Sequence, residues 1–238
     1  MPSNNKIKNC IQNQFETLNI NVHKFNYANI ALIIIASIIA SMALLTNNYQ
    51  SIIASKIIGL AIIPFISLCI MIIAGSRVEI LQSSSRCTVF IGLCLVVSGI
   101  MGYINQMVQW IKQPTPEMLT RANFKYENIW LELCMSGIAG VGIYYAIMKT
   151  SIIALIGLIL AISIVPPLCN AGLFWGMHCF NLINNSNSLK DISNNDIESI
   201  DSANSKYLEY GKNSFVIFVS NITGMFLGFM GAFVISCL

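Results

Sequence analysis

Residues Ile30–Leu45 read IALIIIASIIASMALL and contain no charged residue. A second uncharged stretch, Ile152–Val165, reads IIALIGLILAISIV. A helix needs about 20 apolar residues to cross the hydrocarbon core of a bilayer. Of the 238 residues, 55% are hydrophobic and 10% are charged, whereas roughly 25% are charged in an ordinary soluble domain. The composition predicts a polytopic membrane protein and argues against a secreted domain, a nucleic-acid binder and a disordered chain.

Polar residues divide the chain into six predicted spans, and the fold class is therefore an all-α membrane helix bundle. The predicted spans are 29–46, 51–75, 88–111, 129–148, 151–179 and 213–237. Residues 29–237 form a single membrane domain in this interpretation. Polar residues between Arg77 and Arg86 predict a loop between the second and third spans. A long polar loop is expected at 181–212, with a short helix over about 194–210.

The N-terminal residues 1–28 have the pattern of an amphipathic helix. Apolar residues recur at spacings of three and four between Ile7 and Phe25, with lysines around them. We expect this segment to lie in the headgroup plane, and a helix that binds a soluble partner is the alternative. The Lys and Arg content of the loops, with the long loop discounted, favours an N-terminus on the inside of a bacterial cytoplasmic membrane. The expected partners are the lipid bilayer and another copy of the chain, and no nucleic acid.

The second and fifth spans resemble each other. Each contains Ile-Gly-Leu, at Ile58–Leu60 and at Ile156–Leu158, and each then reaches a proline in mid-membrane, at Pro64 and at Pro166–Pro167. Proline removes a helical hydrogen bond, and paired breaks in two halves are typical of transporter sites. The pattern predicts two inverted three-helix repeats, 29–111 and 129–237, with helices two and five broken at these prolines. Simple proline kinks in a packed bundle are the alternative.

The same breaks predict a central binding site. The candidate substrate-binding residues are Pro64, Ser67, Pro166, Pro167, Asn170 and Asn221. Buried amides need hydrogen-bond partners, and Asn170 and Asn221 could line a cavity or only join helices. Backbone dipoles and neutral amides favour a small neutral solute or a monovalent ion. A non-transporting membrane scaffold or assembly protein is the alternative function.

Lys56 and Glu132 are the only full charges inside the predicted spans. Both lie near a span end, where a side chain can reach the interface, and a coupling role is the alternative. The cysteines inside apolar runs predict small hydrophobic core residues rather than a disulfide framework or a zinc site. No enzyme signature, metal site or cofactor site is expected.

The pieces and their order resemble the membrane family called domain of unknown function 389, found in bacteria and archaea. The resemblance covers roughly residues 28–238 and rests on Ser37–Asn48, Ile58–Leu68, Thr115–Arg121 (TPEMLTR), Val165–Gly172 (VPPLCNAG) and Ser220–Gly224 (SNITG). The chain looks like a short form without the soluble N-terminal domain of many members. Departures include Leu68 in place of a second proline, and Lys56 where the family is apolar. Membership implies a fold and no defined activity.

Overall fold

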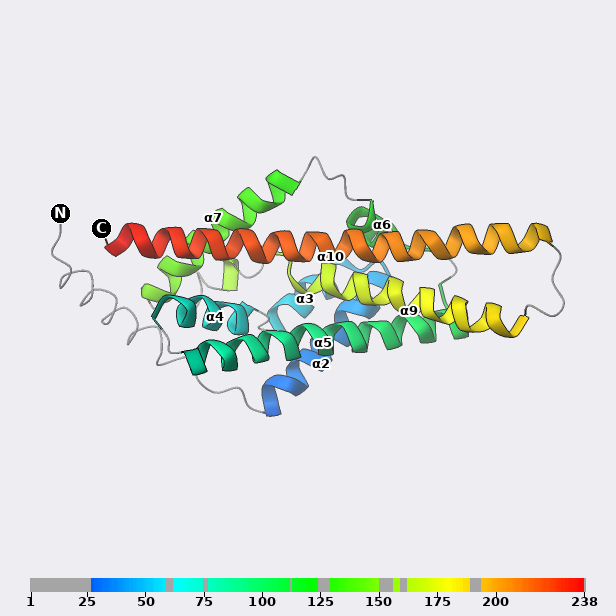
Figure 1. The fold of residues 1–238 in the computed structure, drawn as a ribbon, viewed down its shortest axis with the longest axis horizontal. Helices are drawn as coiled ribbons and strands as arrows, with labels where there is room; N and C mark the ends of the chain where they lie inside the picture. Colours follow the sequence, from blue (N-terminus) through cyan, green and yellow to red (C-terminus); the bar gives the residue numbers. More distant parts are fainter. Residues whose placement is uncertain are drawn as a thin grey trace.

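The computed structural model describes residues 27–58, 62–74, 77–111, 113–123, 129–149, 156–158, 162–188 and 194–237. Within these ranges every regular element is a helix, and the longest helices lie alongside one another (Figure 1). The amphipathic segment predicted at 1–28 falls outside the described residues, apart from its last two residues, which belong to α2 (Tyr27–Leu45). The all-α class is confirmed for the part of the chain that is described.

The second predicted span is two helices, α3 (Tyr49–Ile58) and α4 (Ile62–Ala74). Their axes are bent by 45°. The break lies ahead of Pro64, and the proline sits in the first turn of α4. A proline is well tolerated there, because the first-turn N–H groups have no helical acceptor. The proline therefore begins the second half of the span rather than kinking its middle.

The loop predicted between Arg77 and Arg86 is wrong, because α5 (Arg77–Val108) begins at Arg77. Ser83 is the reason, since it is 2% exposed and shares a 2.7 Å hydrogen bond with Ser67 of α4. That contact packs the first turns of α5 against α4. α5 ends where Gln109 adopts a φ of 51° and the Asn105 side chain bonds the backbone N–H and C=O of Ile111.

The prediction of a long polar loop at 181–212 is also wrong for the described residues, 181–188 and 194–212. α9 (Val165–Ser188) continues to Ser188, and α10 (Asn194–Cys237) is one helix that includes both the expected short helix and the sixth span. Aromatic contacts explain the extension, because Phe174 of α9 stacks on Tyr207 of α10 at 6.1 Å between ring centroids. The described Asn- and Ser-rich residues, 184–188 and 194–205, thus lie at the end of α9 and the start of α10, at the end of Figure 1 farthest from the C-terminus.

Within the fifth predicted span, residues 156–158 are helical and α9 begins at Val165. Pro166 and Pro167 occupy its first turn, and residues 162–164 before it are not helical. The predicted start of this span, at 151–155, and residues 159–161 lie outside the described residues. From Val165 to Phe174 every residue is buried, which makes α9 the central helix, packed against α2, α5 and α10.

Two helix pairs share one packing motif. On α5, Ser98 and Gly99 meet Gly172 and Gly176 of α9, Gly102 meets the Leu173 backbone, and a Cβ added at either α9 glycine would overlap α5 atoms. On α7 (Ile129–Met148), Ser136 and Gly137 meet Gly224 and Gly228 of α10, and Gly140 meets the Met225 backbone, in the same register. Figure 1 shows α5 and α9 running in one direction, and α7 and α10 in the opposite one. Small residues let both pairs of backbones touch.

Four described helices are long and apolar enough to cross a membrane, namely α2, α5, α7 and residues 204–236 of α10. The bent pair α3–α4 makes a fifth candidate. α9 is long but carries Asn170, His178 and Asn181, which lower its hydropathy. These helices are consistent with a multi-pass membrane protein, and the sixth span and the relation of the halves 29–111 and 129–237 stay predictions.

Candidate functional site

Pro64 and Ser67 lie on the buried side of α4. The carbonyl oxygen of Pro64 accepts a hydrogen bond from the Cys87 thiol at 3.3 Å, and Ser67 is 2% exposed and bonds Ser83. The proline carbonyl is therefore satisfied by α5. Both residues have protein partners within the described part of the chain.

Asn170 is fully buried on α9, one turn after the paired prolines. Its side-chain nitrogen donates to the Met118 carbonyl at 3.0 Å and lies 2.9 Å from the Ser214 hydroxyl. Among the described residues, no group hydrogen-bonds its side-chain oxygen. An unsatisfied buried acceptor costs roughly 1–3 kcal/mol, so this oxygen is a place where a ligand would be stabilised.

Asn221 lies on α10, opposite the start of α9. Its side-chain nitrogen donates to the Ser163 carbonyl at 2.9 Å. Ser163 belongs to the non-helical stretch ahead of Pro166, so Asn221 satisfies a carbonyl that the helix break leaves free. Asn221 is seven residues from Ser214, a partner of Asn170, which is about 10 Å along a helix. The convergence of the two amides on one cavity stays a prediction.

The two charges in the predicted spans lie at helix ends. Glu132 is in the first turn of α7, and Lys56 is in the last turn of α3. These are the ends at which the helix dipole favours an anion and a cation, respectively. Lys56 is also within electrostatic reach of Glu117 and Arg121, which places it beside a polar cluster that the sequence did not predict.

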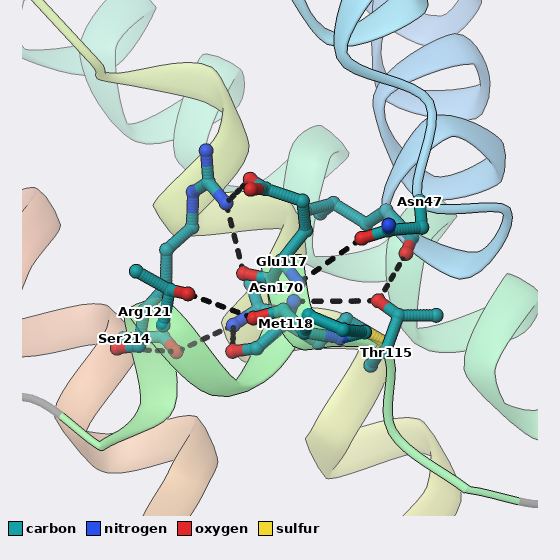
Figure 2. Close-up of polar contacts among 10 residues, drawn as sticks. Asn47, Thr115, Glu117, Met118, Arg121, Asn170 and Ser214 are labelled. Carbon is teal, nitrogen blue, oxygen red and sulfur yellow. Dashed lines mark hydrogen bonds and ion pairs between the residues drawn. The ribbon is translucent and has the colours of Figure 1, made fainter.

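That cluster surrounds α6 (Pro116–Ala122), and Figure 2 shows its hydrogen bonds. Thr115 caps the helix, accepting from the Met118 N–H at 3.4 Å and donating to the Leu44 carbonyl at 2.6 Å. Asn47, in the turn after α2 with a φ of 55°, accepts from the Glu117 N–H at 3.3 Å. Asparagine tolerates this left-handed conformation. The start of α6 is thus fastened to the turn between α2 and α3.

The other end of α6 is fastened to α9 and α10. The last carbonyls of a helix have no N–H donor in the following turn, so they accept hydrogen bonds from outside the helix. Asn170 bonds Met118, Ser214 bonds Arg121 at 3.4 Å, and Asn213 bonds Ala122 at 2.8 Å. α6 therefore joins the first helices of the chain to the last two.

Glu117 and Arg121 form an ion pair on one side of α6. The side chain of Glu117 is 6% exposed and that of Arg121 is 18% exposed. Burial favours the neutral acid, but a hydrogen bond from Tyr49, the Arg121 contacts and the charge of Lys56 outweigh it. The pKa of Glu117 consequently lies below its ordinary value. At neutral pH the cluster contains a carboxylate between two cations.

Sequence reasoning missed Glu117, Arg121, Asn47 and Ser214 as members of a site. The available signal was Thr115-Pro116-Glu117, a capping residue followed by proline and an acid, which predicts a helix start. Its partners lie about 70 residues earlier, in the turn after α2, and about 50 or 90 residues later, in α9 and α10. No local pattern reveals such contacts.

Comparison with known proteins identifies one family. The model of a family described as a domain of unknown function, DUF389, matches residues 57–227. These residues include α6, Asn170 and Asn221, and the match agrees with the resemblance seen in the sequence. No curated protein and no solved structure matches the chain.

Proposed function

The chain belongs to the DUF389 family, whose description assigns no activity, and from that premise we propose that it is a membrane transporter or channel-like protein. The solute is a small neutral molecule or a monovalent ion, which moves through a central site beside the two broken helices. Six segments in two inverted halves would form the pathway in a bacterial cytoplasmic membrane.

One observation carries the proposal, the unpartnered side-chain oxygen of Asn170. It is an acceptor inside the protein, one turn after Pro166 and Pro167 at the start of α9. A hydrogen-bond donor on a solute, or a monovalent cation, would satisfy it. Irregular backbone at membrane depth is tolerated where it is buried or lines a cavity, and the α3–α4 bend and residues 162–164 supply two such places.

The test is a flux screen of solutes and monovalent ions with the purified protein in liposomes. Asn170→Leu removes the free oxygen, and Asn221→Leu removes the amide at the Ser163 carbonyl, so we expect both to reduce flux at least tenfold. The matched control is Asn213→Leu, an amide of the same cluster whose nitrogen bonds Ala122, and it should keep most of the flux. Glu132→Gln should also have a smaller effect.

Thermal unfolding of each variant separates transport from structure. Normal flux in both Asn170→Leu and Asn221→Leu would contradict the proposed site. Loss of folding in both would show that these amides join helices and do nothing else.

A scaffold or assembly protein is the second candidate, and the length of α10 favours it. The helix runs from Asn194 to Cys237, 44 residues, which is about 66 Å at 1.5 Å per residue. That is roughly twice the ~30 Å hydrocarbon thickness. The α9–α10 hairpin then extends beyond the bilayer, where it could contact a soluble partner. A flux screen that is negative for every solute would favour this candidate.

A further inference from the structure

An open hollow lies on the surface of α5, close to the start of the helix. Its volume is about 590 Å³, and six side chains line it, namely Arg77, Val78, Leu81, Gln82, Ser85 and Arg86. Ser83, which packs this part of α5 against α4 through its bond to Ser67, is not among them, so the hollow lies on a different face of the helix. The hollow therefore combines two cationic, two neutral polar and two apolar side chains.

The two arginines of the hollow call for an anion from outside the described part of the chain. Neither forms an ion pair with another described residue, and Glu79, the acidic residue in the first turn of α5, does not line the hollow. A guanidinium binds a phosphate through two parallel N–H donors. Gln82 and Ser85 lie between the two arginines in the sequence and can donate further hydrogen bonds. The hollow is thus complementary to a phosphate-bearing anion.

An exposed apolar face of α5 continues from the hollow toward the C-terminal end of the helix. Val89, Val96 and Ile100 are all exposed. They follow Ser85 at spacings of four, seven and four residues, which keeps them on one side of a helix. A Cβ added at Gly92, within this stretch, would meet nothing within 4 Å. Because α5 is a candidate membrane span, this face suits contact with an acyl chain.

From these two features together we infer that α5 binds an anionic phospholipid, with the phosphate in the hollow and an acyl chain along the exposed apolar face. Basic side chains beside a membrane helix attract anionic lipids. A soluble phosphate compound would leave the apolar face unused, and a zwitterionic lipid would bring no net negative charge to the two arginines. A second copy of the same face would place arginine against arginine. The inference goes beyond the proposed transport and does not require it.

The experiment titrates the purified full-length protein in detergent with phosphatidylglycerol and measures the tightest-bound lipid by native mass spectrometry. Phosphatidylcholine with the same acyl chains is the zwitterionic comparison, and glycerol phosphate is the soluble comparison. We expect phosphatidylglycerol to bind about tenfold or more tightly than either, because only this lipid satisfies both the arginines and the apolar face.

Variants of the two arginines locate the site. Arg77→Gln and Arg86→Gln should each weaken phosphatidylglycerol binding about fivefold, the contribution of one basic residue near an anionic lipid. The matched control is Lys206→Gln, which removes an exposed cation of α10 and should leave the affinity unchanged. Lysine at both arginine positions keeps the two charges and should retain more of the affinity than glutamine at both.

Three results would overturn the inference. One is equal affinity for phosphatidylglycerol and phosphatidylcholine. Another is a variant with glutamine at both arginine positions that binds phosphatidylglycerol as tightly as the unmodified protein, or a Lys206→Gln variant that loses as much affinity. The third is glycerol phosphate that binds as tightly as the lipid, which would assign the hollow to a soluble anion. Thermal unfolding verifies that each variant is folded, and if the double variant is not, the two single variants make the same comparison.

Discussion

Glu117 is a carboxylate that the fold needs in its charged form. It contacts Arg121 and Tyr49, and its pKa is held below the ordinary value. A group with a depressed folded-state pKa stabilises the fold at pH values above its unfolded pKa, about 4.3 for Glu. That contribution is lost as the pH falls through the folded-state pKa.

We therefore expect Glu117→Gln to lower the free energy of unfolding at pH 7 by about 1–3 kcal/mol, because it leaves Arg121 without its anion. The variant should also lose less stability than the unmodified protein between pH 5 and pH 3. Thermal unfolding in detergent across this range measures both effects. Glu209→Gln, on an exposed position of α10, is the control and should follow the unmodified protein. Parallel pH curves for the Glu117 variant and the unmodified protein would contradict the assigned pKa direction.

At this scale the sequence predicted which residues need partners better than it predicted the partners. Asn170 and Asn221 stand in apolar surroundings, so burial and hydrogen bonding could be expected from composition alone. The Met118 and Ser163 carbonyls could not be named as acceptors, because their positions beside the two amides depend on tertiary packing. Glu117 was overlooked because its neighbours in sequence look like an ordinary polar connection.

The glycines of α9 and α10 that contact the backbones of α5 and α7 determine how closely whole helices pack. A Cβ at Gly176 would overlap the Gly99 carbonyl, and a Cβ at Gly228 would overlap the Gly137 carbonyl. Backbone atoms cannot move aside as side chains do. We expect Gly176→Ala and Gly228→Ala each to lower the free energy of unfolding by about 1–3 kcal/mol, as overpacked sites do.

Each helix pair offers its own control. A Cβ at Gly92 of α5 or at Gly231 of α10 meets nothing within 4 Å. Alanine at these exposed positions should be neutral or stabilising by up to ~1 kcal/mol, since alanine favours helix more than glycine does. Chemical denaturation in mild detergent measures the four variants together. If Gly176→Ala or Gly228→Ala were as stable as its control, the helices could move apart with no loss in the free energy of unfolding, which would contradict the prediction.

Periodicity predicted these elements with uneven success. The apolar stretches that became α2 and α7 were located to within two residues, because a bilayer demands long uncharged runs. The polar stretch at 77–86 was interpreted as a loop, although it forms helix. The stretch at 181–212 was interpreted as a loop with one short helix, although its described residues, 181–188 and 194–212, are all helical. Each of these polar segments is buried on one face only, and that face packs against residues that are distant in sequence, such as Ser67 and Phe174. Only the structure shows that Ser98–Gly102 and Ser136–Gly140 each meet a glycine pair on another helix.

At the scale of the whole molecule, the position of the bilayer along α10 decides how the protein is oriented and how much of it is in water. Charged Lys206, Glu209 and Lys212 lie on the half of the helix near α9's end, whereas the C-terminal half exposes Leu227, Val234 and Ile235. Exposed apolar side chains suit lipid, and exposed charges suit water. The exposed residue Ser205 is about 33 Å from Leu227 along the helix, a separation close to the full hydrocarbon thickness.

We therefore expect cysteines introduced at these two exposed positions to be labelled at different rates. In nanodiscs, where both membrane faces are accessible, Ser205→Cys should react quickly with a membrane-impermeant maleimide, and Leu227→Cys should react at least tenfold more slowly. Mass spectrometry counts the label gained over the native cysteines, and labelling in denaturing detergent verifies that both thiols are intact. Equal rates would place Leu227 in water and remove α10 from the spanning helices. Slow reaction at Ser205 would instead bury the α9–α10 hairpin, and with it the surface on which the scaffold alternative depends.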